Sequence, residues 1–412
     1  MLHTSAGPIR RAAPAALAML FALMSSAAVS ASAAVPLQSI PATTTGIHRF
    51  MGIQGDVGHN FTASELTTIA KEDDILVALQ VQISKYGGAL RAANPGLRMF
   101  AYQNGMFAQS NQGSTFPSSW YLRDRSGAKV QSNSNHNYLM NPYSTATYQG
   151  SAGWAAYVGA QCKAKVSAAP LATGCYLDQV SSAGDTSFVT SLPINPSTGK
   201  LFTLSTYMAA VNRVINAAAA KTVVLGNSYE SGNRYYANAD NTVDATNGAA
   251  FEAEHWMGAT QPRDAETLSK WKMDVQMLID SQKNGHGAMV NFQDMSTNLT
   301  QWQGYVVSTM LLGNNGHVWI QFASSSSSGP DALQLNTPLM NAPIGSPTET
   351  YSTTDGYLKG GVYQRSFTKG RVLVNPTGSA VTVKLGSTMT TIGGSRISSL
   401  KLAPYSGTVL LL

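Results

Sequence analysis

The sequence has 412 residues, of which 43% are hydrophobic and only 12% are charged. This composition excludes a disordered chain and is ample for a large core, in two or three domains or in one barrel with a smaller module. The net charge of +6 is not concentrated in any run of Lys or Arg, so we expect no nucleic-acid partner. Two cysteines are too few for a disulfide framework or a Cys-rich metal site.

Residues 1–33 have the pattern of a removable signal peptide. Arg10 and Arg11 precede a run rich in Ala, Leu and Met, and Ala31-Ser32-Ala33 is typical of a cleavage site. The apolar run is short and interrupted, and no other run is long enough to span a membrane. We therefore expect a secreted or periplasmic protein without stable membrane insertion. In that setting Cys162 and Cys175 either form one disulfide or remain two buried thiols.

From about residue 47, short apolar runs alternate with segments of helical period. The predicted strands are 47–53, 75–80, 97–102, 174–178, 222–227, 248–252, 287–291 and 318–322. The predicted helices begin at the capping box Thr62-Ala-Ser-Glu65 and continue at 89–94, 154–166, 201–220, 262–283 and 301–312.

Eight such units over roughly 300 residues predict an α/β fold, a (β/α)8 TIM barrel over residues 45–342. An open doubly wound sheet is the alternative. It usually has a Gly-rich phosphate turn after its first strand, and the glycines that follow this strand, Gly52, Gly55 and Gly58, do not have the spacing of that turn.

The pattern changes after Pro343. Helical periodicity ends, and short β-rich runs separated by Gly-, Pro- and Asn-containing turns follow. These runs cover residues 361–367, 371–375, 380–385 and 408–412. We predict that residues 343–412 form a small C-terminal antiparallel β-sandwich module.

Polar residues, few of them cationic, gather where the predicted barrel strands end. In (β/α)8 enzymes the reacting side chains stand at these carboxyl ends. Trp256 lies in a loop after the sixth strand, where a sugar ring can stack, although loop aromatics more often pack to pin the loop. Glu230 is expected to contact substrate or to cap. We expect substrate contacts from Asp56, Gln80, Tyr102, Asn104, Asn227, Trp256, Asn291, Asp294 and Gln321.

The fourth and sixth strands each end in an acid, Asp178 and Glu252, four residues after a glycine. Side chains from alternate strands of a barrel share a layer, so these two carboxylates are expected to face each other across the mouth. Cleavage of an acetal needs two carboxyl groups, one that protonates the leaving oxygen and one that attacks the anomeric carbon or activates water. A capping or ion-pairing role is the alternative for each acid, and Glu254 competes with Glu252 because it lies on the same face.

Other chemistries lack their motifs in this sequence. The histidines show no metal-ligand spacing, and neither a Gly-x-Ser-x-Gly elbow nor a phosphate-binding Gly-x-x-x-x-Gly-Lys loop occurs. We therefore expect neither a metal nor an organic cofactor.

Several stretches together carry a resemblance to a known family. In the barrel region they are 94–98, 101–104, 120–127, 140–142, 176–179 and 225–227, and in the C-terminal region 361–367 and 370–376. In these stretches and their order the chain resembles the glycoside hydrolases of the glycosidase-like family 15 group. More distantly, it resembles the endo-α-1,4-galactosaminidase-type TIM barrels.

This resemblance implies a catalytic barrel with a C-terminal β-sandwich that acts on α-linked sugars with retention. Carried over, Asp178 is the nucleophile and Glu252 the acid/base. An alignment on Glu-His-Trp selects Glu254 instead. We therefore expect a secreted glycoside hydrolase that cleaves O-glycosidic bonds of a polysaccharide. A barrel that binds polysaccharide without cutting it, and a transglycosylase, are the alternatives.

Overall fold

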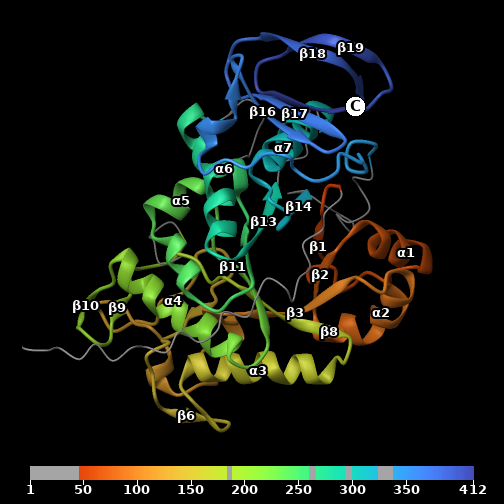
Figure 1. Ribbon diagram of the computed structural model, residues 1–412. Coiled ribbons are helices and arrows are strands. Elements are labelled where there is room, and N and C mark those ends of the chain that lie inside the picture. The colour runs from red at the N-terminus through yellow and green to blue at the C-terminus, as the bar shows by residue number, and fades with distance from the viewer. Residues whose placement is uncertain (1–45, 183–187, 259–265, 293–298, 323–336) are drawn as a thin grey trace, which may run out of the picture. The chain divides into compact units, whose positions relative to one another are not determined.

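The computed structural model describes residues 46–182, 188–258, 266–292, 299–322 and 337–412. The predicted signal peptide, residues 1–33, and the predicted substrate contact Asp294 lie outside the described residues. Figure 1 shows the arrangement of the helices and strands.

Eight parallel strands form the central sheet, as the sequence predicts. In sheet order they are β1 (Phe50–Gly52), β2 (Ile75–Ala78), β3 (Arg98–Asn104), β8 (Ala172–Asp178), β11 (Val223–Asn227), β12 (Ala250–Ala253), β13 (Gly287–Phe292) and β14 (Val318–Phe322). A parallel bridge between Arg49 and Ile320 joins the last strand to the first, and the Ile320 amide donates to the His48 carbonyl over 2.9 Å. The predicted TIM-barrel fold is therefore confirmed.

Helices connect successive strands of the barrel. They are α1 (Ala63–Glu72), α2 (Gln80–Ala93), α3 (Trp154–Ala168), α4 (Leu204–Ala219), α5 (Gly232–Ala237), α6 (Leu268–Lys283) and α7 (Leu299–Gly313). The capping box predicted for α1 is present, with Thr62 and Glu65 bonded reciprocally. α2 begins at Gln80, nine residues before the predicted helix, so Gln80 opens a helix and does not end β2.

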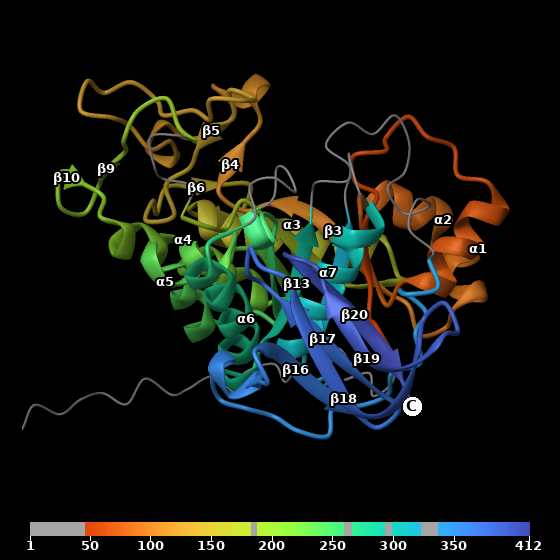
Figure 2. The same cartoon turned by 90° about the horizontal axis from the view of Figure 1, so that it is seen from above.

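A long insertion separates β3 from α3. It contains the short strands β4 (Phe107–Ala108), β5 (Tyr138–Leu139), β6 (Thr147–Tyr148) and β7 (Ser151–Ala152) and two single-turn helices, η2 (Ser110–Gln112) and η3 (Ser118–Trp120). An aromatic cluster around Phe116 packs it against α3, where Trp120 stacks on Phe116 with ring centroids 5.5 Å apart. The hairpin β9 (Ile194–Asn195) and β10 (Lys200–Leu201) lies beside it, and the Ile194 amide donates to the Arg123 carbonyl (Figure 2).

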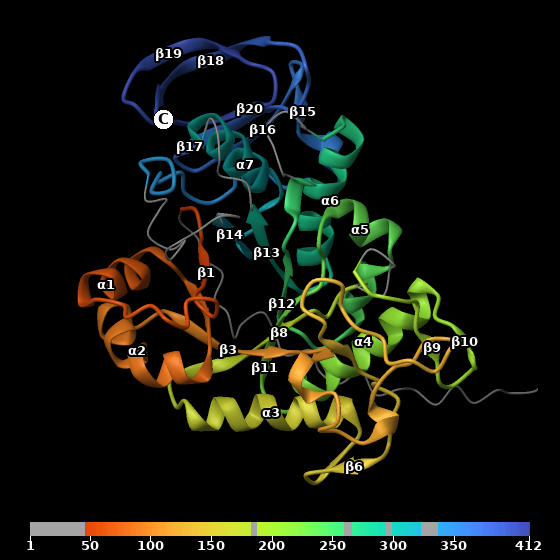
Figure 3. The same cartoon turned by 180° about the vertical axis from the view of Figure 1, so that it is seen from behind.

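The C-terminal module is one six-stranded antiparallel sheet. Its order is β15 (Leu358–Lys359), β16 (Val362–Phe367), β17 (Gly370–Asn375), β20 (Ser406–Leu411), β18 (Val381–Thr391) and β19 (Arg396–Leu402). Alternation along β17 places Val372 and Val374 in the large core with α7, while Leu373 joins a second cluster with β18 and β19. Figure 3 shows β18 and β19 bending over the sheet, so one bent sheet supplies both layers of the predicted sandwich.

Arg365 of β16 fastens the module to α7. Its side chain is fully buried and donates to three carbonyl groups at the end of that helix, those of Leu311 (3.2 Å), Leu312 (2.8 Å) and Asn314 (2.8 Å). The last carbonyls of a helix have no partners within it, so a buried helix end requires donors of this kind.

Cys162 and Cys175 form a disulfide that links α3 to β8. Of the two alternatives that the sequence left open, the disulfide is the one found. Across the described parts of the chain, no helix has both the length and the apolar character needed to cross a membrane.

Candidate active site

The barrel interior consists of an apolar layer followed by a polar one. Inward-facing side chains from all eight strands form an apolar cluster that includes Phe50, Val77, Phe100, Tyr176, Leu225, Ala250, Met289 and Trp319. Two residues toward the carboxyl end, a strand again points inward. On five strands that position holds a polar residue, Asp178, Asn227, Glu252, Asn291 or Gln321. On β3 it holds Tyr102, and Asn104 lies level with Asp178 in the register of β3 and β8.

Asp178 ends β8 and accepts hydrogen bonds from three described groups. The Tyr102 hydroxyl donates to Oδ2 over 2.5 Å, while the Gln179 amide (2.8 Å) and Asn227 Nδ2 (3.1 Å) donate to Oδ1. Burial raises the pKa of Asp178, and these hydrogen bonds act in the opposite direction because they stabilise the ionised form. Tyr102 thus contacts the Asp178 carboxylate, and its predicted contact with substrate stays a prediction.

Glu252 of β12 is only 5% exposed. The Tyr176 hydroxyl donates to its Oε2, and Asn291 Nδ2 donates to its Oε1 over 3.1 Å. Burial and the negative charge of Glu254 raise the pKa of Glu252 to about 8. This carboxyl group is therefore neutral over most of the range in which an enzyme works.

Glu254 lies directly beyond β12 and approaches Asp178. Asn227 Nδ2 donates to Glu254 Oε2 over 2.6 Å and to Asp178 Oδ1 over 3.1 Å, so one amide nitrogen bridges the two acids. The accepting oxygens can be no further apart than these two bonds laid end to end. Burial and the charge of Asp178 raise the pKa of Glu254.

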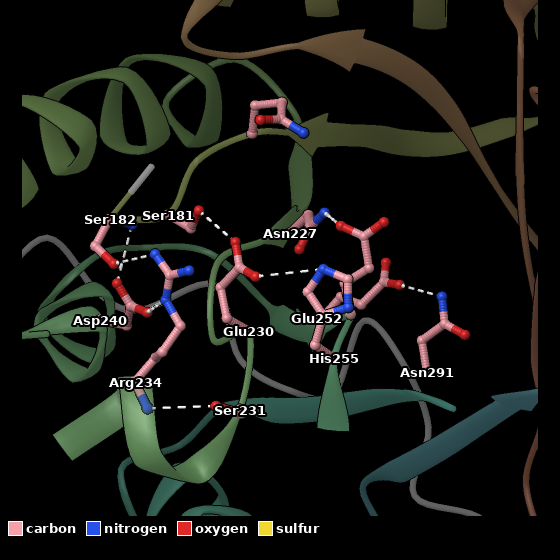
Figure 4. A network of polar contacts seen from close by, with 12 residues as sticks. Ser181, Ser182, Asn227, Glu230, Ser231, Arg234, Asp240, Glu252, His255 and Asn291 are labelled. Atoms are coloured by element: carbon pink, nitrogen blue, oxygen red, sulfur yellow. Dashed lines mark hydrogen bonds and ion pairs between the residues drawn. The ribbon is translucent and has the colours of Figure 1, made fainter. Parts of the chain in front are cut away.

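Glu230, in the loop after β11, brings a fourth acid to this group. It accepts a hydrogen bond from Ser181 Oγ (2.8 Å), and its other oxygen lies 4.0 Å from His255 Nε2, as Figure 4 shows. Its charge contributes to raising the pKa of both Asp178 and Glu254. The sequence expectation for Glu230, substrate contact or capping, stays a prediction.

Three loops of the site contain a non-glycine residue in the left-handed region. Gln179 follows β8 with φ 60°, Glu230 follows β11 with φ 59°, and Met257 follows β12 with φ 63°. Each such residue costs on the order of 1–3 kcal/mol and persists only where its surroundings fix it. The strained residues thus lie in the loops directly after the three strands that contribute Asp178, Asn227 and Glu252.

The other predicted contacts are placed as follows. Gln80 lies in the first turn of α2 and donates to Ser84 Oγ over 3.1 Å. Asp56 lies in the loop after β1, where its amide donates to the Ile53 carbonyl. Trp256 is fully buried, and its indole nitrogen donates to the Asp274 carbonyl over 3.4 Å, so it packs against α6.

Two of the polar interior residues have further roles in the geometry. Asn104 Oδ1 accepts a hydrogen bond from the Phe107 amide over 2.7 Å and so fixes the start of the insertion. Gln321, 9% exposed, pairs with Asn291 in the register of β13 and β14. A small cavity beside Asp178 is lined by residues of β3 and the insertion together with Gln179.

Within the described residues, no three His, Cys, Asp or Glu side chains are grouped so that they could hold a metal ion. The site presents carboxyl groups with amide and hydroxyl donors around them.

The comparisons with known proteins yield structural likenesses alone. No family model matches the sequence, and no curated protein matches it. One similar structure is a noncanonic maltogenic alpha-amylase, AmyB from Thermotoga neapolitana, with 9% identity and a TM-score of 0.46 over 89% of this chain and 99% of that one. Another is the alpha-N-acetylgalactosaminidase NagBb from Bifidobacterium bifidum, with 10% identity and a TM-score of 0.47 over 82% of this chain and 57% of that one.

A third is a glycoside hydrolase family 5 protein from Bacteroides vulgatus, with 6% identity and a TM-score of 0.40 over 89% of each chain. At this level of likeness, neither an activity nor a substrate transfers to this chain. The resemblance to the family 15 group stays a prediction.

Proposed function

We propose that this chain is a secreted glycoside hydrolase that cleaves α-linked polysaccharide with retention of the anomeric configuration. One observation carries the proposal: Asn227 Nδ2 donates hydrogen bonds to the carboxyl groups of both Asp178 and Glu254. Retaining enzymes hold their two carboxyl groups about 5–5.5 Å apart, and inverting enzymes about 6.5–9.5 Å. Two acids bridged by one nitrogen atom favour the shorter separation.

In this proposal Asp178 is the nucleophile. Three hydrogen bonds to its carboxyl group favour the ionised form, and a nucleophile must be ionised when the substrate arrives. Asp178 attacks the anomeric carbon, the bond to the leaving oxygen breaks, and a covalent glycosyl ester forms. Water then cleaves this ester and regenerates the carboxylate.

Glu254 is proposed as the acid/base. Its raised pKa keeps a proton available for the departing oxygen, and the ionised form then takes a proton from the attacking water. Glu254 is partly exposed, whereas Glu252 is buried and bonded through both oxygens. We assign Glu252 the supporting role of a neutral acid beneath the site.

Two features away from the candidate active site also support the proposal, because they fit a secreted protein. The leader-like first 33 residues and the disulfide between Cys162 and Cys175 fit a compartment in which thiols are oxidised. A polysaccharide substrate would be met in that compartment.

The test is a screen of the purified chain from residue 34 onward against α- and β-linked polysaccharides, with NMR observation of the first-formed anomer. We expect an α-anomer released from an α-linked substrate. We expect Asp178→Asn to lose turnover by several orders of magnitude while it still binds the polysaccharide. A β-anomer as first product would overturn retention. Binding by both proteins with no product from either would favour the non-catalytic alternative.

A further inference from the structure

A second acid pair lies behind the proposed site, between α6 and the loops that follow β11 and β12. Asp274 of α6 is 1% exposed, and its carboxyl group is hydrogen-bonded to that of Glu266. Asp274 Oδ2 and Glu266 Oε2 are both buried, and neither accepts a hydrogen bond from an N–H or O–H group of the described residues. Two carboxylate oxygens repel each other at contact, so their hydrogen bond requires a proton on one of them.

Asp274 also holds both neighbouring loops. Its Oδ1 accepts a hydrogen bond from the Gly232 amide over 2.6 Å, and the backbone of Met257 interacts with the same carboxyl group and lowers its pKa. Gly232 lies two residues after Glu230, and Met257 lies three residues after Glu254. Asp274 therefore ties α6 to the two loops that contribute acids to the site.

The contact at Gly232 leaves little freedom for movement. A Cβ atom at Gly232 would lie 2.4 Å from the backbone nitrogen of Asp274. The backbone of the loop after β11 is therefore in direct contact with the backbone of α6. Met257 has a left-handed backbone, which persists only where bonds on both sides fix it. A change in the charge of Asp274 would therefore act directly on the positions of Glu230 and Glu254.

We propose that Asp274 and Glu266 share one buried proton and together form a pH-dependent latch that positions the loops of Glu230 and Glu254. The proposal rests on the function proposed above for those loops. Both residues are positioning residues, because neither belongs to the group of acids around Asp178.

Three titratable groups in the described part of the chain interact electrostatically with this pair. Lys270 on the first turn of α6 acts on Glu266, Tyr305 of α7 interacts with both acids, and Tyr236 of α5 interacts with Asp274. A single nearby ammonium group cannot neutralise two carboxylates. Loss of the shared proton at alkaline pH therefore leaves an uncompensated buried charge, which weakens the latch.

Asp274→Asn and Glu266→Gln test this latch. In the first variant the amide keeps an acceptor for Gly232 and supplies a permanent donor to Glu266, and in the second the new amide donates to Asp274. We expect the melting temperature of the parent protein to fall relative to both variants as the pH rises from about 5 to about 9. On a cleaved substrate, we expect the alkaline limb of kcat/KM to move upward by about one pH unit in both variants.

Asp280→Asn is the matched control, since Asp280 lies on the same helix and bonds the Tyr236 hydroxyl over 2.7 Å. It should leave the pH dependence of melting as in the parent. Parallel melting profiles for the parent and both test variants would overturn the latch, whatever the activity. Diverging profiles without cleavage of any polysaccharide would uphold the shared proton and overturn the proposed function alone.

Discussion

The two sides of the barrel mouth differ in chemistry although the same fold builds them. The strands β8, β11, β12 and β13 place Asp178, Asn227, Glu252 and Asn291 in the polar layer. The equivalent inward positions hold Gly52 at the end of β1 and Leu79 directly after β2, and the exposed side chains nearby include Val57 and Val81. One side thus gathers acids that raise one another's pKa values, and the other offers a surface without charge at those positions. The barrel supplies the positions, and the residue two places beyond the apolar layer decides the chemistry.

The largest effect on activity is expected at Glu254, and it distinguishes the role of this acid from that of Glu252. Glu254→Gln should lower kcat/KM on a polysaccharide by about 10²–10⁴-fold, because general acid–base catalysis is worth that much. Aryl glycosides with good leaving groups should lose far less in the first step, and azide should restore part of the turnover by replacing water in the second. Steady-state kinetics on both substrate types provides the measurement.

Glu252→Gln is the matched comparison. Because Glu252 is neutral near pH 7, the amide should keep most of the activity at that pH. If azide rescued this variant and not Glu254→Gln, the two roles would have to be exchanged.

The bridging amide should have the next largest effect. Asn227→Ala removes the donor shared by Asp178 and Glu254, and a hydrogen bond to a charged group is worth about 1.5–3 kcal/mol. We expect kcat/KM to fall about 10–100-fold and its acidic limb to move to higher pH, since Asp178 loses a bond that stabilises its ionised form. An unchanged acidic limb would contradict the bridging role.

The third prediction concerns stability and Glu252. Its pKa rises from 4.5 in the unfolded chain to about 8 in the folded protein, so the folded state binds the additional proton between these values. The contribution of Glu252 to stability should therefore be full below pH 4.5 and decline as the pH rises toward 8, by on the order of a few kcal/mol. Urea unfolding of the parent and of Glu252→Gln at several pH values measures this, and the variant should show the smaller decline. Equal slopes would show that Glu252 is ionised in the folded protein.

The smallest effect is expected on the uncharged side. Gln80 bonds Ser84 within its own helix, so Gln80→Ala should change kcat/KM by less than about twofold and stability by less than about 0.5 kcal/mol. A tenfold rise in KM would instead place Gln80 against the substrate and remove the contrast between the two sides of the mouth.

Most of the barrel could be predicted from the alternation of apolar runs with segments of helical period and from the helix-capping residues. β8, β11 and β14 end at the predicted residues Asp178, Asn227 and Phe322, and β13 ends at Phe292, one residue beyond its predicted end. Apolar runs buried on both faces stop at, or one residue after, the first inward polar residue. The capping box of Thr62 located α1 for the same local reason.

The remainder depended on tertiary contacts. β19 carries a mostly exposed, weakly apolar sequence, so only its pairing with β18 makes it a strand. The sequence placed Glu252 and Glu254 on one face but contained no signal that Asn227 would bridge Glu254 to Asp178. The burial of Trp256 likewise depends on α6, which lies further along the chain.

Arg365 has a consequence for anyone who wishes to divide this protein. A chain that ends before the C-terminal module would leave the Leu311, Leu312 and Asn314 carbonyls without their donor and would uncover the apolar side of α7. Shortened or chimeric chains should therefore keep β16 and β17 together with the barrel. The module is therefore an integral part of the folded protein, and removing it would take away the support of the last barrel helix.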